Sequence, residues 1–143
     1  MAGIGGAVSK FNAKLARRKL DKLWSEIIHL KYRIPGLRVE KCWWCHCTRG
    51  QMHAHHIFHK NAFPAGRYLL DNGILLCFRD HFKLHHNRET DFIADVVAER
   101  GQAWFTKLQH RCNVSRGTYS PAQYELDFKS LNDELVKLGG KTE

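Results

Sequence analysis

The sequence predicts an α+β fold in one domain, in which helices flank a small central element of two strands and a helix. Apolar residues recur at helical spacing near both ends of the 143-residue chain. Two short strand patterns lie between them, over residues 52–58 and 74–77. We therefore expect a flexible tail at 1–9, a basic N-terminal helix at 10–35, a functional core at 38–90, and C-terminal helices at 91–138 that pack on this core.

Residues 10–32 have the period of an amphipathic helix. Leu20, Trp24 and Ile27 share one face, and Lys and Arg residues lie between the apolar positions. Pro35-Gly36 ends the pattern. The basic face of this helix suits a solvated surface or a contact with DNA, and both roles are compatible with burial of its apolar face.

The second half of the chain is expected to be mostly helical. Residues 78–88 contain no helix breaker, and Thr90 is expected to cap the helix that follows. Gly101 interrupts the pattern, and Ser120-Pro121 is typical of a helix start. The last helix carries an apolar stripe of Tyr124, Phe128, Leu131, Leu135 and Leu138. We expect this stripe to pack in the core, and pairing of two chains as a homodimer is the alternative.

The positive charge is concentrated at the beginning of the chain. Residues 1–60 hold 12 Lys and Arg against 3 Asp and Glu, whereas residues 61–143 hold 11 of each. Such a basic region favours a polyanionic partner, and DNA is the usual one. No apolar run reaches the ~18 residues of a membrane helix. We expect a cytoplasmic protein, or one in the host cytoplasm if a phage encodes it.

Five cysteines without a secretory leader favour metal binding over disulfides. Cys42 and Cys45 have the spacing at which one tight turn offers two ligands to zinc. We expect Cys77 and Asp80 to complete a structural zinc site. Cys47, His46 and His86 are the alternatives to Asp80, and unrelated reduced thiols or redox chemistry are the alternatives to zinc.

Eight of the ten histidines lie between residues 46 and 86, a density that core packing does not explain. His81 and His85 are four residues apart on a predicted helix, so their rings point the same way. With His55 from a strand they offer three imidazoles to a divalent ion, leaving positions for water and phosphate. His56 alternates to another direction and is free to act as a general base.

The order His55-His56-Ile57, Asn72, Cys77-x-x-Asp80-His81-x-x-x-His85 resembles the HNH endonucleases. The resemblance implies a ββα-metal finger with a zinc knuckle, flanked here by the N- and C-terminal helices. It implies that His55, His81 and His85 bind one catalytic divalent metal (Mg, Mn, Ni or Zn). It also implies that His56 is the general base and that Asn72 holds it in place. In the knuckle, Asp80 replaces the usual fourth cysteine.

The flanks, at residues 23–28, 101–103 and 124–138, resemble the phage NinG/Rap recombination nucleases, which act on branched DNA. We therefore expect a metal-dependent DNA endonuclease, with branched recombination intermediates as candidate substrates. The alternative is a non-catalytic zinc-finger-like DNA-binding module, which needs neither His56 nor Asn72. The basic residues expected to contact DNA are Arg17, Arg18, Lys22, Lys60, Arg79, Lys83 and Arg88.

Overall fold

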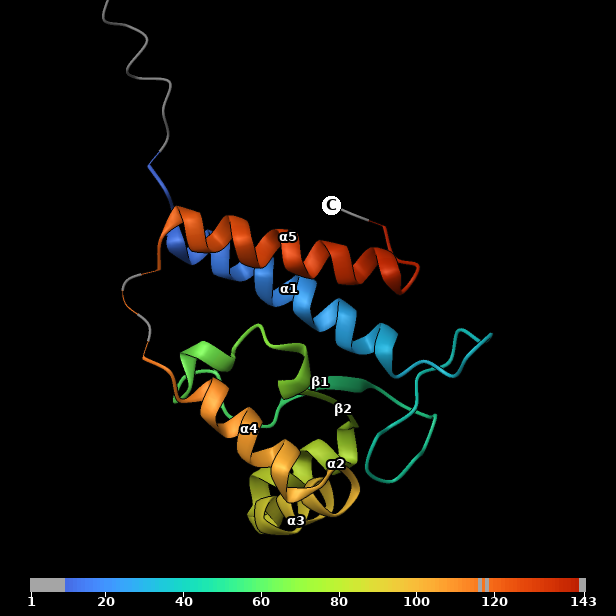
Figure 1. Cartoon of the computed structure of the whole chain (residues 1–143). Helices are drawn as coiled ribbons and strands as arrows, with labels where there is room; N and C mark the ends of the chain where they lie inside the picture. Colours follow the sequence, from blue (N-terminus) through green and yellow to red (C-terminus); the bar gives the residue numbers. More distant parts are fainter. Residues whose placement is uncertain (1–9, 116, 118, 142–143) are drawn as a thin grey trace, which may run out of the picture.

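The computed structural model describes residues 10–115, 117 and 119–141, in which α-helices surround a two-stranded sheet (Figure 1). The tail expected at residues 1–9 lies outside this range. In chain order the elements are α1 (Ala13–Lys31), β1 (Met52–His56), β2 (Gly73–Cys77), α2 (Phe78–Lys83), α3 (Glu89–Arg100), α4 (Gln102–Cys112) and α5 (Pro121–Lys137). The predicted mixture of helices with a small sheet is confirmed. No described helix is long and apolar enough to cross a membrane.

Helix α1 begins where Asn12 caps it, because the Asn12 Oδ1 accepts a hydrogen bond of 3.0 Å from the Leu15 amide. The helix lies within the range predicted from its apolar period. Its inner face is fully buried and consists of Ala16, Leu20, Leu23, Trp24, Ile27 and Ile28. This face forms a large part of the hydrophobic core and brings α1 onto the sheet.

Strands β1 and β2 pair antiparallel, with Met52 opposite Cys77 and His56 opposite Gly73. Every residue of β2 is buried, as its apolar sequence requires. Gly73 is needed at its start, because a Cβ there would lie 2.3 Å from Cδ1 of Ile28. The absence of a side chain therefore allows α1 to pack closely against the sheet. β1 ends at His56, two residues before the end of the predicted strand.

Helix α2 follows β2 directly and is shorter than the helix predicted for residues 78–88. A π-type turn, Leu84–Arg88, replaces its second half, and both His86 and Asn87 leave helical geometry there, Asn87 at φ 75°. The turn leads straight into α3, so Thr90 lies inside the first turn of α3. The expected Thr90 cap is therefore wrong, and no side chain caps this helix.

The last helix, α5, runs beside α1 (Figure 1). Its start is as predicted, because the Ser120 Oγ accepts a hydrogen bond of 3.1 Å from the Gln123 amide. Leu131 and Leu135 are buried in the shared core, while Leu138 at the end of the stripe is 39% exposed. Most of the apolar stripe of α5 is thus used within the chain, and the homodimer remains a prediction.

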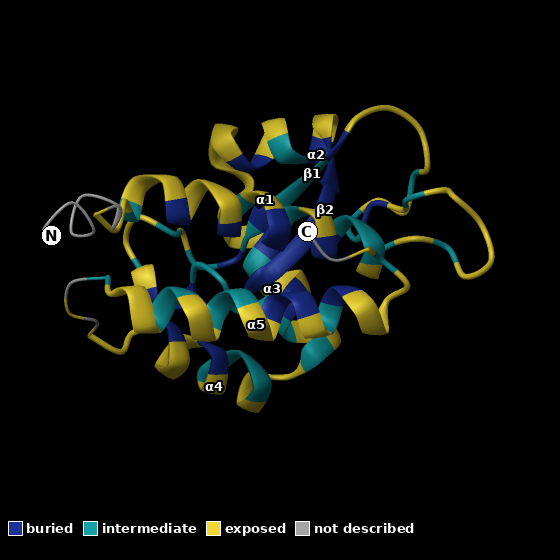
Figure 2. Ribbon diagram, turned by 90° about the horizontal axis from the view of Figure 1, so that it is seen from above, coloured by how far each residue is buried: buried dark blue, intermediate teal, exposed yellow. Residues whose placement is uncertain are grey.

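Burial is greatest where α1 meets the sheet. Figure 2 shows dark blue segments on α1 and β2 in the middle of the molecule and yellow outward faces on the surrounding helices. The loop between α1 and β1 lies apart from this centre and is mostly exposed, yet Cys42 within it is fully buried. With Cys77 on β2, the core therefore includes two residues of the proposed zinc knuckle.

Candidate metal centre and histidine cluster

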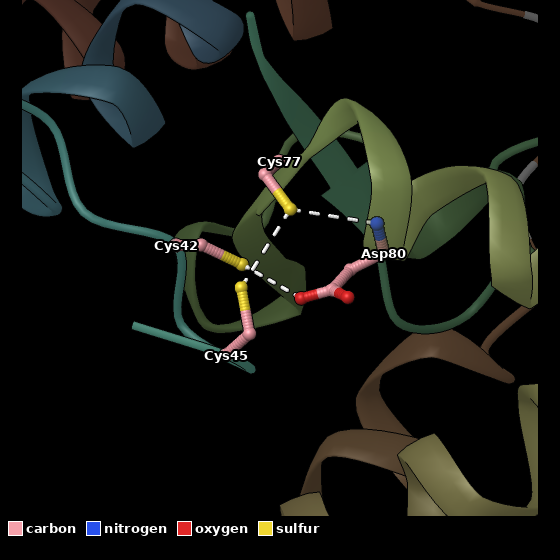
Figure 3. A group of neighbouring side chains, drawn as sticks. All are labelled: Cys42, Cys45, Cys77 and Asp80. Carbon is pink, nitrogen blue, oxygen red and sulfur yellow. Dashed lines mark hydrogen bonds between the residues drawn. The ribbon is translucent and has the colours of Figure 1, made fainter. Parts of the chain in front are cut away.

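Cys42, Cys45, Cys77 and Asp80 come together at one end of the sheet (Figure 3). One ligand atom from each lies within 4.8 Å of all the others. The Cys42 thiol donates a hydrogen bond of 3.2 Å to Oδ2 of Asp80, and the Sγ atoms of Cys45 and Cys77 are 3.7 Å apart. Three sulfur atoms and one carboxylate oxygen converge on one point, which is the arrangement that a tetrahedral metal ion needs.

Local backbone contacts place these four side chains. The loop folds back on itself, because the Cys42 amide donates to the Cys47 carbonyl and the His46 amide to the Cys42 carbonyl. The Trp43 amide then donates to Leu75 of β2 at 2.8 Å and fastens the loop to the sheet. On the other side, Cys77 caps α2, since its Sγ accepts a hydrogen bond from the Asp80 amide.

Burial controls the protonation of this cluster. Desolvation raises the pKa of Cys42 to about 12 and that of Cys77 to about 11. Burial alone would also raise the pKa of Asp80, but hydrogen bonds from the Cys45 and Cys42 thiols hold it below its usual value. The buried thiols therefore keep their protons unless a cation displaces them. Thiolates are soft ligands that favour zinc, so the donor set fits this metal.

Asp80 is the fourth member of this group, in preference to the three alternatives that the sequence leaves open. Cys47 is half-buried and its Sγ lies 3.8 Å from the Arg49 carbonyl. His46 and His86 do not belong to the group either. Across residues 10–115, 117 and 119–141, this is the one group of three or more metal-binding side chains with ligand atoms so close.

The three histidines expected to bind a catalytic metal are neighbours in space. His55 on β1 lies with its ring centre 5.2 Å from that of His81 on α2, and His81 lies 4.8 Å from His85. A cavity of about 570 Å³ opens beside them, and its lining includes His55, His85 and also His59. The ring nitrogens of the three expected ligands do not converge as closely as the atoms of the cysteine group.

His55 is suited to metal binding by its protonation state. It is only 8% exposed, and burial, together with the nearby His81, lowers its pKa to about 3. Burial also lowers the pKa of His81. Both imidazoles are therefore neutral near pH 7, which is the form that binds metal ions.

His56 lies on the opposite face of β1 from His55, against α1. Its ring stacks on Trp24 at 3.9 Å with an angle of 5° between the planes. Its Nε2 donates a hydrogen bond of 2.8 Å to the Arg67 carbonyl. Burial lowers the pKa of His56 to about 4, so the neutral ring carries its lone pair on Nδ1. His56 does not line the cavity beside His55.

Arg67 and Asn72 hold the loop between the strands. The Arg67 guanidinium forms two hydrogen bonds to Asp21 of α1, at 2.8 and 2.6 Å. Asn72 is fully buried, and its Nδ2 donates to the Phe58 and Gly66 carbonyls while its Oδ1 accepts from the Phe58 amide. These bonds fix the chain on both sides of the Arg67 carbonyl to which His56 binds.

His53 is a residue of the histidine cluster that the sequence motif does not include. Its ring centre lies 5.1 Å from that of His81, and its Nε2 is buried with no hydrogen-bond partner among the described residues. The two-residue period of a strand places His53 on the same face as His55, so this signal was present in the sequence. No sequence pattern indicated that the His56 ring stacks on Trp24.

The basic residues expected to bind DNA come from separate elements. Arg17, Arg18 and Lys22 are exposed on α1, and Arg79 and Lys83 are exposed on α2. Arg88 pairs with Asp91 at 2.6 Å, and Lys60 is half-buried in the loop after β1. The charge available to an extended polyanion therefore lies mainly on α1 and α2.

Comparisons with protein-family models, with characterised proteins and with solved structures give no match for this chain. The resemblance noted in the sequence therefore depends on the residues themselves. What these residues offer chemically is one sulfur-rich cluster and one group of imidazoles beside a cavity.

Proposed function

We propose that this protein is a metal-dependent DNA endonuclease of the HNH type, and that β1, β2 and α2 are its ββα-metal finger. The observation that carries the proposal is the grouping of His55, His81 and His85, of which His55 and His85 line a cavity. His56, on the other face of β1, and Asn72 lie at the end of the hairpin where β1 leads into the loop. A module that only binds DNA would need neither a general base at His56 nor an Asn72 that holds the neighbouring loop.

The two clusters have different roles in this proposal. Cys42, Cys45, Cys77 and Asp80 hold one structural zinc ion, which joins the loop after α1 to the start of α2. The imidazoles of His55, His81 and His85 hold the catalytic divalent ion, for which Mg, Mn, Ni and Zn are the candidates. When bound, this ion offsets the negative charge on the phosphate and on the leaving 3′ oxygen.

His56 supplies the base in the hydrolysis of the phosphodiester. Because its Nε2 donates to the Arg67 carbonyl, its Nδ1 is the atom that accepts a proton from the attacking water. The new bond joins the water oxygen to phosphorus, and the bond from phosphorus to the 3′ oxygen breaks. The 3′ oxygen takes a proton from solvent. The products carry 5′-phosphate and 3′-hydroxyl ends.

The resemblance to the NinG/Rap nucleases extends the proposal to the substrate. We infer that branched DNA is cut in preference to plain duplex. Comparing a four-way junction with its linear arms at matched salt tests this part separately. Equal cleavage of both would leave a general HNH nuclease.

The experiment that tests the proposal measures nicking of supercoiled plasmid with each divalent metal in turn. The wild type should cleave, and His56→Ala should lose about 10²–10⁴-fold in rate, the usual contribution of a general base. His110→Ala, an exposed histidine on α4, is the matched control and should cleave normally. Activity of His56→Ala at the wild-type rate would place the base elsewhere. Absence of cleavage by the wild type, with DNA binding intact, would favour the non-catalytic zinc-finger-like module.

A further inference from the structure

Two phenylalanines of α2 lie on the surface of the protein. Phe78 is 59% exposed and Phe82 is 54% exposed. Full burial of a Phe side chain is favoured by about 1.5–3 kcal/mol, so two exposed neighbouring rings on one short helix offer apolar area to a partner. Nothing in the part of the chain that the structure describes covers them.

The two rings belong to a continuous aromatic row. Phe78 and Phe82 are stacked with their ring centres 6.2 Å apart, and the ring of His86 follows at 4.3 Å from Phe82. At the other end, Phe78 contacts the ring of His53, which lies against His81. We call Phe78, Phe82 and His86 the aromatic row. It leads from the histidine cluster out to solvent.

The rotation of the helix places this row between the histidines and the basic residues. Each helical residue is turned by about 100° from the one before. Asp80 points inward to the cysteine cluster. Going around the helix from Asp80, the side chains of His81, Phe82 and Lys83 therefore come in that order. Arg79 and Lys83 are exposed beyond the row, and Asp80, the one carboxylate of α2, is buried. Helix α2 therefore presents aromatic and positively charged side chains and no exposed acidic group of its own, and Asp95 of α3 lines a pocket together with Lys83.

We propose that the aromatic row stacks unpaired nucleobases of a DNA strand whose phosphates lie along Arg79 and Lys83. This inference depends on the proposed function, which it extends to the substrate class: DNA with unstacked bases next to the scissile bond. Every base has a π-face, so stacking on Phe rings holds single strands without reading sequence. A protein partner would use the same apolar area but would have no requirement for aromatic rings.

The test compares two labelled 12-nucleotide strands by fluorescence anisotropy, at fixed salt and without added catalytic metal. One is oligothymidylate, and the other carries abasic sites, so that its phosphates are the same and its bases are missing. The wild type should bind the thymidylate strand about 10-fold more tightly, the size expected of one stacked base. Phe78→Ala/Phe82→Ala should lose this difference and should bind the abasic strand as before.

Conservative replacements of both rings separate stacking from simple apolar contact. Phe78→Trp/Phe82→Trp should keep the preference for bases, whereas Phe78→Leu/Phe82→Leu, which keeps two apolar side chains, should lose it. Leu126→Ala, which removes a side chain 64% exposed on α5, is the matched control and should change nothing. Thermal unfolding and zinc content verify that each variant is folded.

Equal wild-type affinity for both strands would overturn the proposal. An unchanged preference for bases in Phe78→Leu/Phe82→Leu would also overturn it and would indicate a protein-docking face instead. Because binding is measured without cleavage, failure of the wild type to cut DNA would contradict the nuclease proposal and leave the stacking result standing.

Discussion

A free histidine titrates near neutral pH. The His56 ring is buried and stacked on Trp24, and this environment keeps it uncharged. Its pKa falls from 6.5 in the unfolded chain to about 4 in the folded protein. The unfolded state therefore binds more protons below pH 6.5, and folding becomes less favourable as pH falls toward 4. From pH 7 to pH 4 this single group should lower the free energy of unfolding by on the order of 3 kcal/mol.

Replacing His56 with Phe tests this prediction, because Phe keeps a stacking ring and does not titrate. The free energy of unfolding, measured with denaturant at pH 7, 6, 5 and 4, should fall less steeply in His56→Phe than in the wild type. A parallel decline in both proteins would mean that the other histidines and the cysteine cluster account for the acid sensitivity.

The proposed metal ligands His81 and His85 should differ from the proposed base His56 in how added metal restores activity. His85→Ala and His81→Ala each remove one of the three proposed ligands, so they should lower cleavage mainly by weakening metal binding. Raising the concentration of the divalent ion should restore part of their activity, whereas His56→Ala should gain nothing. Titrating the metal in the plasmid assay separates the two classes. A His85→Ala rate that is independent of metal concentration would remove His85 from the ligand set.

At the level of the loop and α2, the cysteine cluster is expected to stabilise the fold through its zinc ion. Structural zinc contributes ~10–16 kcal/mol of apparent binding energy in small fingers. Cys42→Ser and Cys77→Ser should therefore misfold, and elemental analysis should find zinc in the wild type. Cys47→Ser is the matched control, because Cys47 lies outside the group, and it should keep its zinc.

Asp80 is the unusual member of the cluster, and two substitutions there should have opposite effects on zinc binding. Asp80→Ala should lose zinc and melt at a lower temperature, because it leaves three ligands. Asp80→Cys should retain zinc, since it restores the four thiolates of common knuckles. Unchanged zinc content in Asp80→Ala would mean that Cys47, His46 or His86 is the fourth zinc ligand.

The hairpin loop depends on Asn72 in a similar way. Its side chain satisfies the Phe58 amide and the Phe58 and Gly66 carbonyls in the interior. An unsatisfied buried polar group costs about 1–3 kcal/mol, so Asn72→Ala should destabilise the protein by several kcal/mol and also reduce cleavage. Asn72→Asp should destabilise the protein as much, because a carboxylate oxygen would replace the amide that donates to the Phe58 and Gly66 carbonyls. Chemical denaturation measures the effect, and wild-type stability of either variant would contradict this role of the Asn72 hydrogen bonds.

Local patterns predicted the elements better than they predicted the contacts between them. The apolar period predicted α1 and α5, and Ser120-Pro121 predicted where α5 begins. The π-type turn at His86 and Asn87 could not be predicted, because neither Gly nor Pro marks it. The grouping of Cys42, Cys45, Cys77 and Asp80 followed from ligand chemistry and spacing. The Trp24 stack and the Asp21–Arg67 pair join distant segments, which no local pattern reports.

Over the whole molecule, the charge is divided unequally between the two parts of the chain. Residues 1–60 carry the entire net charge of +9, and Arg17 and Arg18 are among the exposed residues of α1. Helix α1 also packs on the sheet and, through Trp24, contacts His56. The same helix therefore supports the site with its inner face and offers positive charge with its outer face.

This division predicts how the proposed DNA binding depends on salt. Each phosphate neutralised contributes about −0.9 to the slope of log K against log salt for duplex DNA. If Arg17 and Arg18 each contact one phosphate, the double change to Glu should flatten the slope by about 1.8 and weaken binding to all sequences alike. Anisotropy with two unrelated duplexes over a salt series measures both effects. Lys107→Glu/Lys129→Glu makes the same change in net charge on exposed residues of α4 and α5. An equal flattening in this control would mean that overall charge, and not the outer face of α1, attracts the DNA.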